Sequence, residues 1–198
     1  NLITSAGADR VLTMDLHCMQ IQGFFDIPLD NLIGGPTLYN YFKPKVDDNF
    51  VVVSPDIGSV SRARKVAARM DAKMAIIDKR RPKANVMELM NIIGDVEGKN
   101  CLMVDDMIDT AGTIVQGAKA LKDAGAKEIY ACCSHGVLSG PAIERLAASP
   151  IQELAILDTI NIPQEKMLPS FRIISTAPIF ASAIENVYLD KPMSKIYD

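Results

Sequence analysis

The stretch Cys101-Leu-Met-Val-Asp-Asp-Met-Ile-Asp-Thr-Ala-Gly-Thr-Ile-Val-Gln-Gly-Ala-Lys-Ala-Leu-Lys-Asp-Ala124 joins an apolar run, a turn of small and acidic residues, and a helical pattern. The run Cys101–Val104 is typical of a buried strand. The segment Ile114–Ala124 keeps one face apolar at helical spacing, and Gly125 follows where helices commonly end. The stretch therefore predicts a strand, a loop and a helix in succession.

The rest of the chain repeats this alternation of short apolar runs and helical patterns. The other predicted strands are Arg10–Asp15, Phe50–Val53, Met74–Ile77, Ile129–Cys133, Leu154–Leu157 and Arg172–Ile174. The other predicted helices are Val60–Met70, Pro141–Ala148 and Ala177–Tyr188. Strands that alternate with helices form βαβ units, so we predict an α/β protein with a mostly parallel sheet flanked by helices. Ligands of such sheets bind just past the carboxyl ends of the strands.

The composition is that of an ordinary globular protein. Hydrophobic residues make up 48 % of the 198 residues, which is enough for a real core. The net charge of -3 lacks the basic excess of nucleic-acid-binding proteins, so no nucleic-acid partner is expected. No apolar stretch reaches the length of a membrane span and no leader opens the chain, which predicts a cytoplasmic protein without a membrane partner. The 4 cysteines lack metal-ligand spacing, and no disulfide framework is expected.

The loop Val104–Thr113 holds the densest set of candidate ligand-binding residues. Backbone N–H groups of Asp109–Thr113 open the following helix, where unpaired donors and the helix dipole attract an anion. Ala111 and Gly112 are small enough for a phosphate to approach the backbone, and two threonines add hydroxyl donors. Two acids at the strand end are placed to accept hydrogen bonds from vicinal ribose hydroxyls. A simple helix cap needs only one such residue, so the loop predicts a sugar-phosphate site. The candidate substrate-binding residues are Asp105, Asp106, Asp109, Thr110, Ala111, Gly112 and Thr113.

Two motifs together resemble one enzyme family. The loop Val104–Thr113 is similar to the phosphoribosyl pyrophosphate loop shared by phosphoribosyltransferases and ribose-phosphate pyrophosphokinases. The stretch Asp15-Leu-His-Cys-Met-Gln-Ile-Gln-Gly-Phe-Phe-Asp-Ile-Pro-Leu-Asp30 resembles the signature of the pyrophosphokinases alone, although Cys18 replaces a small or polar residue. The resemblance covers the whole chain. It implies a phosphoribosyltransferase-type fold and transfer of diphosphate from MgATP to the 1-hydroxyl of ribose 5-phosphate, giving AMP and 5-phosphoribosyl 1-diphosphate.

The same resemblance assigns the metal and diphosphate contacts. It makes His17 a magnesium-linked residue, although a lone histidine at a strand end is more often structural and Mg²⁺ prefers oxygen ligands. In the turn Ser54-Pro-Asp-Ile-Gly-Ser59, Asp56 is placed to hold Mg²⁺ directly or through water. Gly58 and Ser59 are the candidate diphosphate contacts, with Ser59 where the family usually has a second glycine. An ordinary Pro-Asp turn is the competing interpretation.

The run Lys79-Arg-Arg-Pro-Lys83 is the densest positive charge in the chain. A solvated basic turn is the usual interpretation of such a run. Its position after the predicted strand Met74–Ile77 favours a catalytic loop, because phosphoryl-type transfer needs cations on the migrating group. The resemblance makes Lys79 and Arg81 the catalytic residues, which stabilise charge as the sugar hydroxyl attacks the β-phosphorus.

A short internal repeat is consistent with a duplicated fold. Ala6-Gly-Ala-Asp-Arg-Val11 leads to His17, and Ala124-Gly-Ala-Lys-Glu-Ile129 leads to His135 at the same offset. Chance similarity of two helix-to-strand turns is the alternative. His135 has no family motif around it, and we interpret it as structural.

The resemblance implies a division of the chain into two unequal parts. Residues 1–33 are expected to be the remnant of an N-terminal phosphoribosyltransferase-like domain, and residues 34–198 are expected to be its C-terminal counterpart. Linker signals stand at Gly34-Gly35-Pro36 and Lys43–Asn49. The strand Arg10–Asp15 is expected to lack sheet neighbours. The family's main adenine-binding residues precede the part that this chain resembles, so the chain alone is expected to be inactive.

Family members are homo-oligomers, commonly hexamers, and the resemblance implies a homo-oligomer here. The segment Lys191-Pro-Met-Ser-Lys-Ile-Tyr-Asp198 resembles a tail that helps to form an allosteric phosphate and ADP site between subunits. Ser194 matches a serine of that tail, whereas Pro192 replaces another, so regulation by these effectors is left open.

Two other functions are weighed against this one. A phosphoribosyltransferase of base salvage would share the loop Val104–Thr113 but has no reason to carry the Asp15–Asp30 signature. A non-catalytic regulatory homologue of the synthase would share the fold, yet it would not need the charged loop in which this chain retains Lys79, Arg81 and Pro82.

Overall fold

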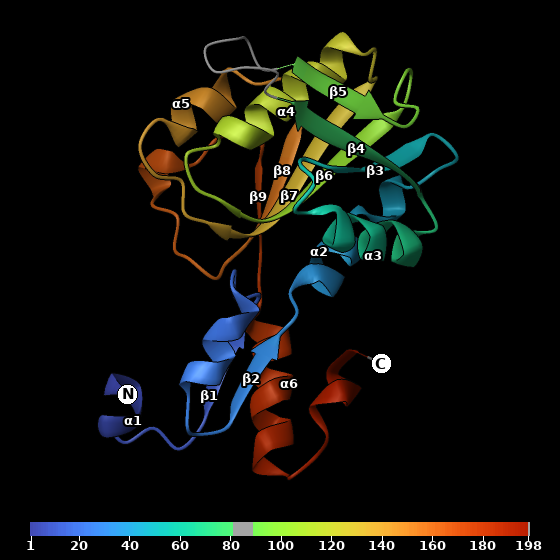
Figure 1. Ribbon diagram of the computed structural model, residues 1–198. Coiled ribbons are helices and arrows are strands. Elements are labelled where there is room, and N and C mark those ends of the chain that lie inside the picture. Colours follow the sequence, from blue (N-terminus) through green and yellow to red (C-terminus); the bar gives the residue numbers. More distant parts are fainter. Residues whose placement is uncertain (81–88, 198) are drawn as a thin grey trace.

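Seven strands form the central sheet of the computed structural model, which describes residues 1–80 and 89–197 (Figure 1). The strands are β3 (Phe50–Ser54), β4 (Lys73–Arg80), β5 (Leu89–Ile93), β6 (Asn100–Ile108), β7 (Glu128–Gly136), β8 (Glu153–Leu157) and β9 (Phe171–Ile174). Their order in the sheet is β5-β4-β3-β6-β7-β8-β9. Only the pairing of β4 with β5 is antiparallel among the described strands of this sheet. The predicted α/β class with a mostly parallel sheet is confirmed.

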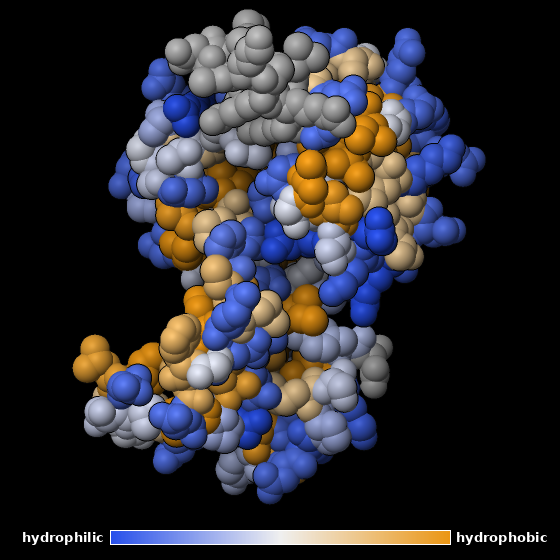
Figure 2. Space-filling model, viewed as in Figure 1, coloured by the Kyte–Doolittle hydropathy of each residue, from blue (hydrophilic) through white to orange (hydrophobic). Residues whose placement is uncertain are grey.

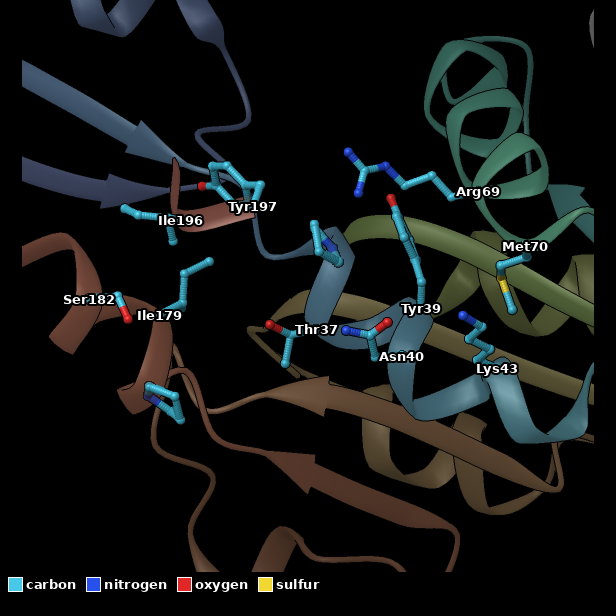
Figure 3. Close-up of a pocket in the computed structure, with 12 residues that line it drawn as sticks. Thr37, Tyr39, Asn40, Lys43, Arg69, Met70, Ile179, Ser182, Ile196 and Tyr197 are labelled. Carbon is cyan, nitrogen blue, oxygen red and sulfur yellow. The ribbon is translucent and has the colours of Figure 1, made fainter. Parts of the chain in front are cut away.

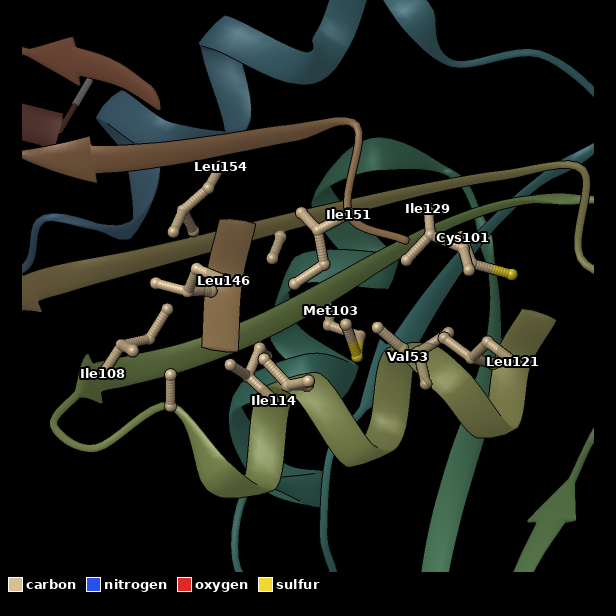
Figure 4. Close-up of a cluster of buried hydrophobic side chains, with 14 of the residues drawn as sticks. Val53, Cys101, Met103, Ile108, Ile114, Leu121, Ile129, Leu146, Ile151 and Leu154 are labelled. Carbon is tan, nitrogen blue, oxygen red and sulfur yellow. The ribbon is translucent and has the colours of Figure 1, made fainter. Parts of the chain in front are cut away.

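Helices cover both faces of this sheet. They are α2 (Gly35–Phe42), α3 (Val60–Met70), α4 (Gly112–Asp123) and α5 (Ala142–Ala147). On one face, α4 and α5 bury a cluster that includes Met103 and Leu121 (Figure 4). On the other face, α2 and α3 bury a second cluster that includes Phe42 and Leu102. Side chains alternate between the two clusters along each strand because successive strand residues point to opposite faces.

The cysteines follow this alternation. Cys133 belongs to the cluster under α4 and α5, and Cys132 belongs to the cluster under α2 and α3. All four cysteines are free, and Cys18 is the exposed one. The chain therefore has no disulfide framework, as its cysteine spacing predicts.

A smaller layer lies beside the C-terminal helix (Figure 1). In it, β1 (Val11–Met14) and β2 (Leu29–Leu32) form a parallel two-stranded sheet, and α6 (Ala177–Tyr188) lies next to β2. Short helical elements complete the description of the chain: α1 (Leu2–Ser5), η1 (Met19–Phe24), η2 (Lys43–Lys45), η3 (Gln164–Lys166) and η4 (Met193–Tyr197). The molecule narrows where this layer meets the large sheet (Figure 2). The domain division expected after residue 33 falls between β2 and α2 and stays a prediction.

Two expectations about local structure are wrong. The strand near Arg10–Asp15 has a neighbour, since β1 pairs with β2. The expected linker Gly34-Gly35-Pro36 begins α2, because proline is tolerated in the first helical turn, where its missing N–H would have no partner. Part of the second expected linker, Lys43–Asn49, is the 3-10 helix η2.

The strand predicted at Cys101–Val104 is longer than its apolar run. It continues as β6 to Ile108, because β7 pairs with it as far as Gly136. The two acids predicted at the strand end therefore belong to the strand. By contrast, the helices Val60–Met70 and Ala177–Tyr188 have the predicted bounds.

The local part of the internal repeat is confirmed. Gly7 and Gly125 both have a left-handed backbone, with φ of +97° and +83°, and each follows the end of a helix. Within residues 1–80 and 89–197, no helix is both long and apolar enough to cross a membrane.

Candidate functional site

Three segments that are far apart in the sequence meet at the carboxyl end of β6. His17, in the turn after β1, lies with its Nδ1 2.7 Å from Oδ2 of Asp106. Arg62 of α3 donates from Nη1 to Oδ1 of Asp105 at 3.1 Å, and the same nitrogen lies 3.2 Å from Oδ1 of Asp106. Asp106 is buried, whereas the side chain of His17 is 60 % exposed. Two adjacent carboxylates are thus held between a guanidinium group and an imidazole.

The two carboxyl groups differ in pKa. Burial raises the pKa of Asp105 to about 7, and hydrogen bonding with the Asp106 side chain adds to the rise. Burial also opposes ionisation of Asp106, but the hydrogen bond from His17 and the charge of Arg62 outweigh it and lower the pKa of Asp106. Two like charges so close favour one shared proton, and this arrangement assigns that proton to Asp105.

The raised pKa of Asp105 predicts a pH-dependent stability. Between about pH 4 and about pH 7 the folded chain binds a proton at Asp105 that the unfolded chain has released, so this group's contribution to the free energy of unfolding falls as the pH rises. Asp105→Asn cannot ionise. We expect the variant to gain stability relative to the unaltered chain between about pH 5 and about pH 8 in urea unfolding.

The control for this measurement is Asp123→Asn, which removes an exposed acid from α4. It should change stability equally at both pH values. The same result for Asp105→Asn would contradict the raised pKa.

The loop Asp109–Thr113 leads from β6 into α4. Ala111 has a left-handed backbone with φ of +59°, and Gly112 is the first residue of the helix. A non-glycine residue in this conformation costs about 1–3 kcal/mol and persists only where the surroundings hold it. The first N–H groups of α4 have no partner within the helix and form a place for an anion.

Neighbouring segments hold this loop. Ser139 donates its backbone N–H to the carbonyl of Asp109 at 3.1 Å, and its hydroxyl donates to the Asp109 carboxylate. Arg145 of α5 donates to the carbonyl of Thr110 at 2.9 Å. A Cβ built on Gly112 would lie 3.5 Å from Nη1 of Arg145, so a cation stands beside the start of α4.

The turn between β3 and α3 brings Asp56 to the same region. Oδ1 of Asp56 accepts a hydrogen bond from the backbone N–H of Ser59 at 2.8 Å, and the hydroxyl of Ser54 donates to the carbonyl of Asp56 at 2.7 Å. These contacts fit the ordinary-turn interpretation. The hydroxyl of Ser59 also lies 3.4 Å from Oδ1 of Asp105, which connects the turn to the carboxylate pair.

Asp15 connects the small sheet to the large one. Its backbone is left-handed, with φ of +43°. From the small layer, its N–H donates to the carbonyl of Leu32 at 2.9 Å, and its Oδ2 accepts from the N–H of Gly34 at 3.1 Å. From β7, the hydroxyl of Ser134 donates to the same Oδ2. The turn that carries His17 therefore starts from a residue that both sheets hold.

The carboxylate pair, Arg62, His17 and the turn after β3 line a cavity of about 690 Å³. The predicted site residues among its lining are His17, Asp56, Gly58, Ser59, Asp105 and Asp106. Among the described lining residues, those of the predicted phosphate loop Asp109–Thr113 are absent. The structure thus brings the predicted metal and diphosphate residues close to the carboxylate pair. The predicted phosphate loop follows β6, the strand that carries this pair, but its described residues do not line the cavity.

Of the two predicted catalytic residues, the structure places the backbone of one. Lys79 is near the end of β4, where it pairs with Met90 of β5. Arg81 lies outside the described residues.

A second cavity, of about 580 Å³, lies between α2, α3 and the C-terminal elements α6 and η4 (Figure 3). The described residues that line it include Lys43 and Arg69 but none of the predicted site residues. Tyr39 lines both cavities. Burial raises the pKa of Tyr39 to about 12, so its phenol stays protonated at neutral pH.

The side chains near His17 suit a metal ion that is already bound to water and to substrate phosphates. Within the described residues, no group of three or more histidine, cysteine, aspartate or glutamate side chains is arranged to hold a metal ion. Mg²⁺ usually keeps several waters and takes one or two carboxylates together with substrate phosphates. Asp56, which lines the same cavity as His17, supplies one such carboxylate.

Sequence reasoning missed the role of two arginines. Arg62 is one of several cations on α3, and helical spacing does not tell which of them faces β6. Arg145 lies in α5, remote in sequence from the loop that it contacts. The contacts of both depend on how separate elements pack, and no local pattern marks them.

The chain matches known proteins over its whole length. A family model described as the phosphoribosyl synthetase-associated domain matches residues 78–198. A ribose-phosphate pyrophosphokinase from Clostridium perfringens is 60 % identical over 200 residues, and one from Caldanaerobacter subterraneus is 61 % identical over 198 residues. Each match covers 100 % of this chain and 63 % of the relative, so the chain spans less than two thirds of those relatives.

The fold of this chain is also similar to that of a solved structure. The crystal structure of phosphoribosylpyrophosphate synthetase from Mycobacterium smegmatis is similar with a TM-score of 0.86 and 40 % sequence identity. The match covers 96 % of this chain and 62 % of that chain.

Proposed function

This chain belongs to the phosphoribosyl synthetase family, and we propose that it serves a ribose-phosphate diphosphokinase reaction for nucleotide biosynthesis. In this reaction, the 1-hydroxyl oxygen of ribose 5-phosphate bonds to the β-phosphorus of ATP. The bond from the β-phosphorus to the bridging oxygen of AMP breaks. The products are AMP and 5-phosphoribosyl 1-diphosphate.

The observation that carries the proposal is the contact between His17 and Asp106. His17 lies in the segment that resembles the pyrophosphokinase signature, and Asp106 lies on the strand that leads into the sugar-phosphate loop. Their side chains meet at 2.7 Å although 89 positions separate them. A base-salvage transferase needs the sugar-phosphate loop but has no reason to bring a signature histidine to it, so this contact favours the diphosphokinase.

The proposed binding places follow from the site. The 5-phosphate takes the N–H groups at Asp109–Thr113, with Arg145 beside them. The ribose hydroxyls lie toward Asp105 and Asp106, whose orientation Arg62 sets.

Magnesium and the cationic loop complete the proposal. Mg²⁺, held near His17 and Asp56, would neutralise charge on the diphosphate. Gly58 and Ser59 contact the diphosphate through the turn after β3. Lys79 and Arg81 supply positive charge to the migrating group.

The proposed protein is a cytoplasmic homo-oligomer, with ATP and ribose 5-phosphate as its small-molecule partners. The relatives' name supports the two substrates, and the family resemblance of the motifs supports the homo-oligomer. The composition of an ordinary globular protein supports the cytoplasmic setting. Because the chain spans 63 % of those relatives, catalysis is assigned to a protein of the relatives' full length.

Two measurements test the proposal. Calorimetry should show that this chain binds ribose 5-phosphate. A protein of the relatives' full length that contains this chain should release AMP from MgATP and ribose 5-phosphate at about 1–100 s⁻¹, whereas this chain alone should be far slower. Without the remaining part, ATP lacks the alignment that can account for about 7–11 kcal/mol of a barrier. Consumption of 5-phosphoribosyl 1-diphosphate with a free base, instead of AMP release, would show a salvage transferase.

A further inference from the structure

Both histidines of the chain lie at the junction between the two sheets. His135 stands near the end of β7, where it pairs with Met107 of β6, next to Asp106. Its Nε2 lies 3.1 Å from the backbone carbonyl oxygen of Asp15. A carbonyl can only accept a hydrogen bond, so this ring nitrogen donates. The second histidine of the internal repeat therefore contacts the turn that carries the first.

The opposite edge of the His135 ring is held as well. Its Nδ1 lies 2.8 Å from the hydroxyl oxygen of Thr159, which also lies 2.7 Å from the carbonyl oxygen of Ser134. Because Nε2 carries the proton of a neutral ring, Nδ1 is an acceptor that the single hydroxyl proton of Thr159 can reach. The ring thus spans the distance between the segment after β8 and the turn after β1. Rotation of the ring would break both contacts.

The turn that His135 contacts needs support. Asp15 has a strained left-handed backbone, and the next residue, Leu16, donates its N–H to the side chain of Asn31 at 3.2 Å. His17 then reaches Asp106 at 2.7 Å. Each residue from Asp15 to His17 is therefore held by a different partner, and His135 is the partner that binds the Asp15 carbonyl.

We propose that His135 and Thr159 are positioning residues, which fix the carbonyl of Asp15 and thereby hold His17 against Asp106. The effect of this positioning on catalysis rests on the proposed function, in which His17 lies near the MgATP phosphates. The contacts on opposite edges of the ring fix its orientation, and one of them is made to the turn that carries His17.

Imidazole NMR of this chain tests the positioning directly. Because the chain has 2 histidines, each contributes one identifiable set of ring signals. Thr159→Val keeps the shape of the side chain but removes the hydroxyl, and the Nδ1 signal of His17 should move toward that of a free imidazole. Thr159→Ser restores the hydroxyl and should restore the signal. An unchanged His17 signal in Thr159→Val would overturn the proposal.

His135→Phe is the second variant. It keeps a ring and removes both nitrogens, so the His17 signal should move as in Thr159→Val. Retention of the original His17 signal by a folded His135→Phe would show a space-filling role and overturn the proposal. If this variant does not fold, the Thr159→Val and Thr159→Ser pair decides.

Kinetics of a full-length protein that contains this chain give an independent readout. Thr159→Val should lower kcat by about tenfold or more and change the KM for ribose 5-phosphate by less than about twofold, since Ser139 and Arg145 hold the phosphate loop separately. A raised KM with unchanged kcat would overturn the positioning role. If the unaltered protein released no AMP, the proposed function would be wrong, and the NMR comparison would decide the positioning role by itself.

Discussion

Replacement of Lys79 by alanine, in a protein of the relatives' full length, should lower turnover by about 100- to 1000-fold and leave ribose 5-phosphate binding nearly intact. Loss of one preorganised donor to transition-state charge typically costs roughly 3–4 kcal/mol. The predicted phosphate loop follows β6, whereas Lys79 lies near the end of β4, so the proposed sugar-phosphate binding and charge stabilisation would come from different strands. Steady-state kinetics of AMP release, with calorimetry for ribose 5-phosphate, measure the two effects.

The matched control for this prediction lies on the same strand. Lys73 is exposed at the start of β4, at the opposite end of the strand from Lys79, and Lys73→Ala should leave turnover within about twofold. If Lys79→Ala raised the KM for a substrate and left kcat unchanged, Lys79 would bind the ground state and the catalytic role would be wrong.

Replacement of Gly112 by alanine should weaken ribose 5-phosphate binding by about tenfold or more, which corresponds to about 1.4 kcal/mol or more. The added methyl group would occupy the place from which a phosphate reaches the first N–H groups of α4. The protein itself has room for it, since a Cβ on Gly112 would lie 3.5 Å from Arg145 and 3.9 Å from Thr110. Because the fold tolerates the change, a loss of affinity would show that the methyl group blocks the phosphate.

Calorimetry measures the affinity for ribose 5-phosphate, and thermal unfolding measures the stability of the fold. Alanine is a better helix former than glycine and the added Cβ has room, so Gly112→Ala should be at least as stable as the unaltered chain. Lys119→Ala, an exposed change in the same helix, is the control and should leave affinity unaltered. Equal affinity of Gly112→Ala and the unaltered chain would place the phosphate elsewhere.

The helix and strand pattern was predictable because it depends on neighbours in the sequence. Val60–Met70 and Ala177–Tyr188 have the predicted bounds, since an apolar face at helical spacing defines a helix locally. The apolar runs predicted most strands, but some strands extend beyond these runs into polar residues. Asp105 and Asp106 extend β6 because the backbone of β7 pairs beside them, and side-chain hydropathy does not report that pairing.

Elements with weak local signals were missed for the same reason. Gly34-Gly35-Pro36 has the composition of a linker, yet it begins a helix whose Leu38 and Phe42 are buried against the large sheet. Burial of that apolar face stabilises α2, and the local propensity of its first residues does not. The pairing of β1 with β2 likewise depends on contacts between segments that a local pattern cannot relate.

By itself, the sequence determined the fold class and the family, and it predicted a phosphate loop, because periodicity and short motifs are properties of neighbouring residues. The tertiary structure alone decided which residues meet. It brought His17 to Asp106, set Arg62 between two carboxylates and placed His135 against Asp15. Each of these contacts joins different elements. Packing of the small sheet against the large one brings His17 and His135 to their partners, and packing of α3 on the large sheet brings Arg62 to the carboxylates. The pKa values of the carboxyl pair follow from that packing, since burial and neighbouring charge exist only in the folded chain.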